Sequence, residues 1–264
     1  MAFDVNNFVI DHVLRGLMTS SADGSVMWSI NQITEPSLSV TSETAEAVDA
    51  LGSTIATFNR GKQAEFSANN SLFDLGLFAA QNGKDKEVAS ASATITTPAF
   101  ETIDVKDGED TVTLKHTPNA QIEAIYALKG DGTLGTKYTV DTTATATTFV
   151  HTDGTATLTL PSDLVAGSQL FVMYMYEAEN AVAVTSDSIN FPKAGKFIME
   201  VLGTDVCDPT TLIHAYIVFP NAKLDANVDI SFTTDGNHPF KLIAQQAYCD
   251  AKKVLFQIVI PEEA

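Results

Sequence analysis

The sequence has 264 residues, of which 45% are hydrophobic and 18% are charged, and its formal net charge is −18. A chain of this length can form one large domain or two ordinary ones, and its hydrophobic content excludes a disordered protein. Because an acidic surface repels phosphate groups, a DNA-reading protein and a protein that docks on anionic membranes are both disfavoured. Short runs rich in Thr and Val, separated by Gly, Asp and Asn, predict mostly β structure.

The two cysteines, Cys207 and Cys249, are too few for a disulfide framework, and their separation fits no zinc pattern. We expect two partly buried free thiols, while a single disulfide remains open if the protein works outside the cell. The N-terminal "MAFDVNNFVIDHVLRGLM" lacks the basic region and apolar core of a signal peptide. No apolar run is long enough for a transmembrane helix, so we expect folding in a cytoplasm or export without a standard signal.

The first segment is expected to begin with a short helix, because its apolar residues between positions 8 and 18 recur at roughly a 3.6-residue period. The stretches "SVMWSINQI" and "SLSVTS" then predict strands, with Pro36 between them.

A hairpin is predicted next, because apolar and polar residues alternate over residues 54–67. A two-residue turn would pair Phe58 with Gln63 and mix the two faces, whereas a three-residue loop keeps the apolar residues opposite one another. We therefore expect Gly61 in the loop at positive φ. The apolar residues expected on one face are Ala56, Phe58, Ala64 and Phe66. The expected turn residues are Arg60, Gly61 and Lys62.

The stretch "SLFDLGLFAAQNG" predicts a short helix after the hairpin. Ser71 is the expected N-cap, Asp74 has the spacing of a capping box, and Gly83 is expected to end the helix. The residues expected on the buried face are Leu72, Leu75, Phe78 and Ala79.

Residues 98–192 contain successive strand candidates separated by turn signals such as Gly130-Asp131-Gly132. Short strands at this spacing over about 100 residues predict an immunoglobulin-like β-sandwich, although the Cys and Trp signature of that fold is missing. In the run "FVMYMYEAEN", Phe171, Met173 and Met175 face one way. This alternation is more typical of a central sandwich strand than of an aromatic binding platform.

Residues 193–264 contain strand candidates that are richer in Ile, Leu and Phe. These strands resemble the first segment in apolar content and need partners. The simplest arrangement is one discontinuous domain, formed by residues 1–97 and 193–264, into which residues 98–192 are inserted. The candidates are "KFIMEVLG", "LIHAYIVFP", "VDISFTT", "PFKLIAQQAY" and "KVLFQIVIP".

Acidic residues cluster at Asp107, Glu109 and Asp110, but this cluster lacks the spacing of a calcium loop, and a solvated turn is the better interpretation. Cys207, flanked by Asp205 and Asp208, would need a histidine partner to act as a nucleophile, so a structural turn is favoured there too.

The five histidines show no metal-ligand spacing, and no phosphate-binding or nucleophile motif occurs. His214 is expected to be a satisfied core or interface residue, and His238 a turn residue. We therefore expect no enzyme activity, no cofactor and no metal site.

The first and third segments resemble phage tail tube, or major tail, proteins. The stretch "SLSVTSETAEAVDALGSTIATFNRGKQAEFSANNSLFDLGLFAAQNG" is similar to the strand, polar loop, hairpin and flanking helix of that family. The stretch "AYIVFPNAKLDANVDISFTTDGNHPFKLIAQQAYC" is similar to its closing strands. The middle segment resembles the immunoglobulin-like decoration of many tail proteins, although here it lies inside the chain. The fold implied is a tail-tube-type β-sandwich or barrel with a flanking short helix, plus an inserted immunoglobulin-like β-sandwich.

The resemblance implies hexameric rings whose strands join into a continuous β-barrel, and stacked rings that form a tube conducting DNA from capsid to host. The implied partners are further copies of the chain, the tape measure, the tail tip and the terminator. DNA would pass without specific binding, and no membrane insertion is implied. The implied location is the virion tail, after assembly in the host cytoplasm.

The resemblance also gives candidate surfaces. The polar loop at residues 41–52 is a candidate contact between rings, and the polar face of the hairpin is a candidate lumen surface, where acidic groups would let DNA slide. The inserted domain would project outward and collide with a sheath, which favours a non-contractile tail. The loop residues are Glu43, Glu46 and Asp49. The lumen residues are Thr57, Gln63 and Glu65.

Three alternatives remain open. A surface adhesin or carbohydrate-binding β protein is disfavoured because few surface aromatic residues and no export signal are visible. A capsid protein would be expected to show a long helix, and a baseplate component stays a near neighbour. An enzyme on a β scaffold would need a cluster of perturbed carboxylates or histidines.

Overall fold

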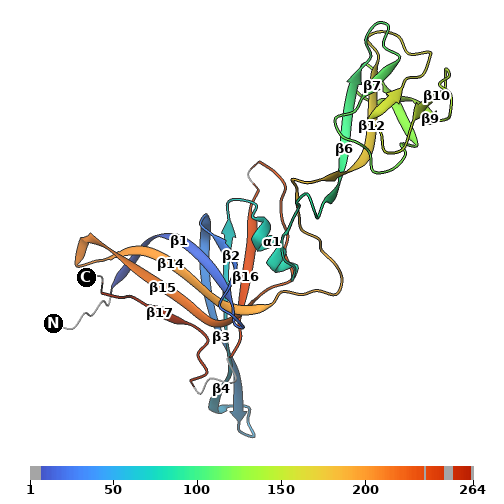
Figure 1. Cartoon of the computed structure of the whole chain (residues 1–264). Coiled ribbons are helices and arrows are strands. Elements are labelled where there is room, and N and C mark those ends of the chain that lie inside the picture. The colour runs from blue at the N-terminus through green and yellow to red at the C-terminus, as the bar shows by residue number, and fades with distance from the viewer. Residues whose placement is uncertain (1–6, 235, 247–251, 263–264) are drawn as a thin grey trace. The chain divides into compact units, whose positions relative to one another are not determined.

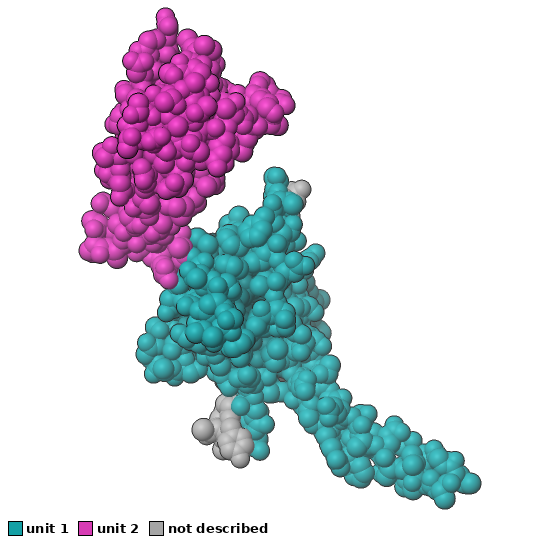
Figure 2. All heavy atoms as spheres, turned by 90° about the vertical axis from the view of Figure 1, so that its right-hand side faces the viewer, with its two compact units in different colours: residues 1–86, 184–264 teal, residues 87–183 magenta. Residues whose placement is uncertain are grey.

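The computed structural model describes residues 7–234, 236–246 and 252–262. The chain is mainly β, as predicted, with one short helix in the described part. It divides into two compact units, residues 1–86 with 184–264 (unit 1) and residues 87–183 (unit 2) (Figure 2). Each unit has its own sheet and its own hydrophobic core. Among the described residues, no helix has the length and hydropathy needed to cross a membrane.

Unit 1 is a curled half-barrel built from one antiparallel sheet with the strand order β2-β1-β14-β15-β16-β4-β3, in which β17 also pairs with β15 (Figure 1). Strands from the end of the chain lie between β1 and β4, so neither end segment can complete this sheet alone. The bounds are β1 Phe8–Ser20, β2 Val26–Ile30, β3 Ile33–Val48, β4 Thr54–Asn70, β14 Ala194–Asp205, β15 Asp208–Leu224, β16 His238–Ala244 and β17 Gln257–Val259.

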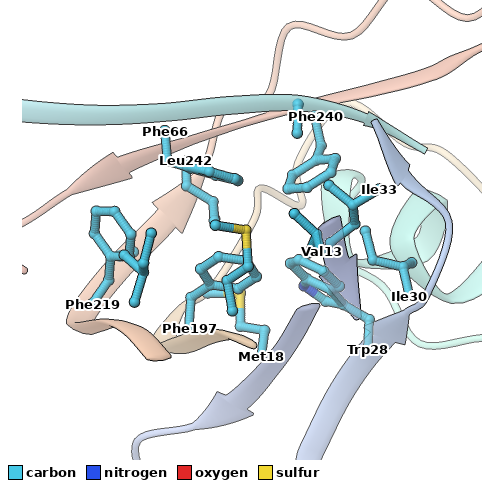
Figure 3. Packing of buried hydrophobic residues seen from close by; sticks show 14 of the residues in the cluster. Val13, Met18, Trp28, Ile30, Ile33, Phe66, Phe197, Phe219, Phe240 and Leu242 are labelled. Atoms are coloured by element: carbon cyan, nitrogen blue, oxygen red, sulfur yellow. The ribbon is translucent and has the colours of Figure 1, made fainter. Parts of the chain in front are cut away.

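The core of unit 1 is a cluster of aromatic rings on the inner face of this sheet (Figure 3). The Phe197 ring lies 5.5 Å from the Trp28 ring and 5.7 Å from the Phe66 ring, measured between centroids. Phe66, Phe197 and Phe219 are fully buried, and burying a side chain of this size stabilises a fold by ~1.5–3 kcal/mol. The rings come from β2, β4, β14 and β15, so this core holds the two ends of the chain together.

The helix expected at residues 8–18 is wrong, because this segment is strand β1. Two register shifts against β14, between Ile10 and His12 and between Val13 and Arg15, each insert an extra residue into β1. These bulges change the spacing of the inward-facing residues from a strict two-residue period, and the result imitates helical spacing. The strand expected at "VDISFTT", residues 228–234, is also wrong, since the chain there is irregular.

The hairpin turn expected at Arg60, Gly61 and Lys62 is wrong as well. Strand β4 continues through all three residues, and the turn between β3 and β4 lies at residues 49–53. Thr41 pairs with Gln63, whereas Glu43 pairs with Arg60, so β4 has one extra residue at this point. Gly61 has φ of 57°, which confirms the positive φ expected there, but in a β-bulge rather than a turn.

Helix α1 spans Leu75–Gln81, and its N-cap is Asp74 rather than the expected Ser71. The Asp74 carboxylate accepts a 2.7 Å hydrogen bond from the backbone N–H of Leu77. Gly83 follows the C-cap with φ of 68°, as expected for a helix end. Because the helix starts late, its buried face differs from the expected one, and Leu72 and Leu75 are exposed. The buried residues of α1 are Leu77, Ala79, Ala80 and Gln81.

Unit 2 is a seven-stranded sheet with the order β6-β12-β8-β9-β10-β11-β7, beside a short pair formed by β5 and β13. Strands β9 and β10 pair in parallel. Edge strand β6 runs across the border expected at residues 97 and 98. The bounds are β5 Glu87–Val88, β6 Ile95–Asp104, β7 Thr111–Thr113, β8 Ala124–Leu128, β9 Leu134–Val140, β10 Thr148–His151, β11 Thr157–Thr159, β12 Gln169–Ala178 and β13 Val182–Ala183.

Strand β12 lies between β6 and β8 and turns one face toward the core of unit 2. Val172 and Tyr174 are buried there, while Met173 and Met175 on the other face are exposed. Phe171 stacks on Phe100 of β6 with 6.0 Å between the ring centroids. The expected alternation is therefore present, and its outer face is open to solvent.

Candidate assembly surface

The most prominent surface feature of unit 1 is the far end of the β3–β4 hairpin, residues 43–60, which we name the arm. Strand β16 pairs with β4 from Glu65 to Asn70, so among the described strands β3 and β4 pair only with each other within the arm. The arm projects from the body of unit 1 (Figure 1). Two strands without a covering layer bury little apolar surface, so packing within unit 1 does not explain the length of the arm.

The bulge at Gly61 reverses the apolar face of the hairpin. Val40 lies opposite Ala64 on the core side, whereas Ala45 lies opposite Phe58 in the arm. Strand β3 has no extra residue between Val40 and Ala45, and side chains five positions apart in a strand point to opposite faces. The arm therefore presents Ala45 and Phe58 on the side away from the core.

This reversal corrects two sequence expectations. The apolar residues of the arm, such as Phe58, do not share a face with Ala64 and Phe66. Likewise, Thr57 pairs with Glu46 and lies on the opposite face from Gln63 and Glu65.

The tip of the arm combines an ordered turn with exposed apolar side chains. The Asp49 carboxylate accepts hydrogen bonds from the backbone N–H groups of Leu51 at 2.9 Å and Ser53 at 2.8 Å. Leu51 is 92% exposed and Ile55 is 69% exposed. Large apolar residues gathered at an exposed tip are typical of a protein contact site.

The three acids expected to meet a neighbouring ring all lie in the arm, two of them in a strand rather than in the expected loop. Glu43 and Glu46 belong to strand β3, and Asp49 belongs to the tip turn. Glu46 accepts a 3.1 Å hydrogen bond from the hydroxyl group of Thr54 across the hairpin. All three are exposed, so two of them stabilise the arm while remaining available to solvent.

The outer face of the sheet next to the arm is polar. Gln63 and Glu65 lie on this face, and the Glu65 carboxylate is 2.8 Å from the ammonium group of Lys241 on β16. The hydrogen bond with Glu65 raises the pKa of Lys241. Nearby, the Asn69 amide donates to the Glu35 carboxylate at 2.7 Å.

A second polar cluster on unit 1 was not found by sequence reasoning. The Glu200 carboxylate lies 2.6 Å from Arg15 Nε and 2.9 Å from His214 Nδ1, and the three residues come from β14, β1 and β15. Arg15 and Tyr216 both pair with Glu200 in the register, which puts them on one face. Only a correct pairing of three distant strands could have revealed this cluster from the sequence.

The remaining sequence candidates are structural. Cys207 is exposed rather than partly buried, and Cys249 lies outside the described residues. Glu109 accepts a hydrogen bond from the backbone of Lys106 within a turn, as expected for a solvated loop. His238 is buried at the start of β16 and is not a turn residue. Within the described ranges, no three His, Cys, Asp or Glu side chains are grouped as metal ligands.

The comparison with known families agrees with an assembly surface. The model of the YomU/Tube protein family matches residues 8–251, so the chain belongs to this family. Membership in this tail tube-like family indicates a structural role in the tail tube of a virion and self-assembly into a tube. The family is structural, which is consistent with a protein that is not an enzyme. No curated protein matches the chain.

Proposed function

We propose that copies of this chain form hexameric rings that stack into a phage tail tube, which conducts DNA from the capsid to the host. The observation that carries this proposal is the arm, which exposes Leu51 and Ile55 outside the described hydrophobic core of unit 1. Such residues are best explained by a contact with another copy. Glu43, Glu46 and Asp49 would surround this contact between rings.

The open edges of the unit 1 sheet support the proposed ring. Strands β2 and β3 end the sheet path, and β3 presents a 16-residue edge. An open edge invites pairing with another chain, and closing strands into a barrel across copies removes the edges. A head-to-tail contact that closes after six copies gives a ring, while stacking of rings gives an open-ended tube.

The polar outer face near the arm is the proposed lumen surface. Gln63 and Glu65 would face the passing DNA there, and Thr57 would not. Carboxylates on such a wall repel phosphate groups, so DNA would slide without specific binding. The ammonium group of Lys241, which is paired with Glu65, offsets part of this negative charge. The wall would therefore neither attract nor repel DNA strongly.

The inserted part of the chain, expected at residues 98–192, is proposed to be an immunoglobulin-like domain on the outside of the tube. Such domains would obstruct a sheath, which favours a non-contractile tail. The tape measure, the tail tip and the terminator are the proposed protein partners. The proposed location is the virion tail, with assembly in the host cytoplasm.

Negative-stain electron microscopy of the purified protein over a concentration series, with mass measurement in parallel, tests this function. We expect hollow rings and tubes of uniform diameter with six copies per ring. The double variant Leu51→Ser, Ile55→Ser should keep its fold and lose tubes. A matched control, Leu134→Ser at an exposed residue of unit 2, should leave tubes intact. Particles that stay monomeric even with tail-tip complexes present would overturn the proposal.

A further inference from the structure

A second exposed apolar surface lies on unit 1, beside helix α1. Phe73, just before the helix, packs edge-on against Phe232 with 5.5 Å between ring centroids. Phe232 is 80% exposed, and Leu72 and Leu75 next to Phe73 are also exposed. We name these four residues the aromatic patch. The Phe73 ring is held in place, because it also stacks on the buried His238 ring with 5.2 Å between the centroids.

The aromatic patch and the arm tip lie at opposite ends of unit 1. In Figure 1 the arm leaves the sheet at one end, while α1 and the segment that joins β15 to β16 lie at the other. An arm tip therefore cannot reach the patch of its own chain. Two different surfaces at opposite ends of unit 1, each apolar, fit a head-to-tail contact, which repeats without closing and generates a filament.

Other exposed apolar residues of unit 1 suit a different contact. Val9, Ile10 and Leu212 belong to strands β1 and β15, whose outer edges are only partly paired. Residues of that kind accompany side-by-side strand pairing. Phe73 and Phe232 belong to neither helix nor strand in the described structure, so they can accept side chains but offer no strand edge.

We propose that the arm tip of one copy docks on the aromatic patch of a second copy in the next ring, with Leu51 and Ile55 packed against Phe73 and Phe232. This inference rests on the proposed tube function and names both surfaces of its repeating contact. The two phenylalanine rings supply the large apolar area that dominates the energetics of an interface, and the aliphatic side chains of the arm tip would bury it.

Cysteine cross-linking in assembled tubes tests the contact. The variant Leu51→Cys, Phe232→Cys is prepared with both native cysteines replaced by serine and is oxidised after assembly. Each chain then carries one cysteine at the arm tip and one on the aromatic patch. Disulfides between successive copies should therefore give a ladder of covalent oligomers. The linked fraction should exceed that of the control pair Leu51→Cys, Ile258→Cys by on the order of tenfold, because docking raises the effective concentration of the two thiols.

The outcomes separate the two proposals. If tubes form but the Leu51–Phe232 pair links no better than the control pair, the docking contact is wrong and the tube function stands. If the parent protein forms no tubes, the tube function itself fails. A complementation experiment adds a second readout, in which Leu51→Asp and Phe232→Asp each prevent tubes alone. Mixed together they should give two-ring stacks and no longer tubes, and long tubes from the mixture would overturn the docking contact.

Discussion

His238 Nε2 lies 2.8 Å from Gln81 Oε1, a contact that joins the start of β16 to the last turn of α1. The other ring nitrogen, Nδ1, accepts a 3.2 Å hydrogen bond from the backbone N–H of Asp74. The imidazole is therefore neutral, with its proton on Nε2. Gln81 in turn donates to the Pro239 carbonyl at 3.0 Å, so the helix is fixed to the sheet by a connected set of bonds.

This arrangement predicts a pH dependence for the stability of unit 1. Burial lowers the pKa of His238 below its ordinary value of 6.5, although the Asp74 carboxylate opposes the shift. As the pH falls below 6.5, the unfolded chain takes up a proton before the folded chain does, so the free energy of unfolding decreases until the folded pKa is passed. Above 6.5 the contribution is fully present. Urea unfolding between pH 5 and 8, read from the Trp28 fluorescence, measures this change.

His238→Gln is expected to be less stable at pH 7.5 and to lose most of this pH dependence. His12→Gln, which replaces an exposed histidine of the same unit, is the matched control for the substitution. An unchanged slope in His238→Gln would show that another group is responsible.

Gly83→Ala should destabilise unit 1 strongly. Gly83 has φ of 68°, and a Cβ atom there would lie 2.2 Å from the Phe191 carbonyl oxygen. Backbone strain of this kind costs about 1–3 kcal/mol, and the clash adds to it. Thermal unfolding measures the loss. Gly130→Ala is the control, since a Cβ atom at Gly130 meets nothing within 4 Å and should change stability little.

Gly61→Val should loosen the arm without unfolding the body of unit 1. The left-handed conformation costs a side-chain-bearing residue about 1–2 kcal/mol, and among the described strands β3 and β4 pair at this point without a third strand. We expect faster amide hydrogen exchange at residues 43–60 and unchanged exchange in β14. Equal acceleration in both regions would contradict a local role for the bulge.

Tyr174→Phe should destabilise unit 2. The Tyr174 hydroxyl donates to the buried Glu101 carboxylate, and burial together with this contact raises the pKa of Tyr174 to about 12. Removing the donor leaves Glu101 with the backbone N–H of Lys115 as a remaining partner, which we expect to cost about 1.5–3 kcal/mol. Calorimetry of the variant checks this loss, with Tyr126→Phe on the neighbouring strand β8 as the control of small effect.

Particular residues show how far the sequence could be interpreted. The alternation around Val172 and Tyr174 predicted a strand correctly, because side-chain alternation is a local property of an extended backbone. The sequence predicts that Gly83 ends the helix and that Gly61 has positive φ, and both predictions are confirmed. The sequence favours Ser71 as the cap because both Ser71 and Asp74 can cap a helix. In the structure the cap is Asp74, whose backbone N–H bonds to the distant His238, a contact that no local pattern shows.

The sequence by itself determined that the protein is mainly β and that a short helix follows the hairpin, and the residues quoted for the tail tube resemblance fall within the matched family region. Only the tertiary structure decided that residues 8–18 form a strand and that β4 passes through Gly61 without turning. The reason is that one extra residue can be absorbed either by a turn or by a bulge with the same local pattern. Hydrogen bonds to distant strands, which no local pattern encodes, select between them and so decide which face of the arm is apolar.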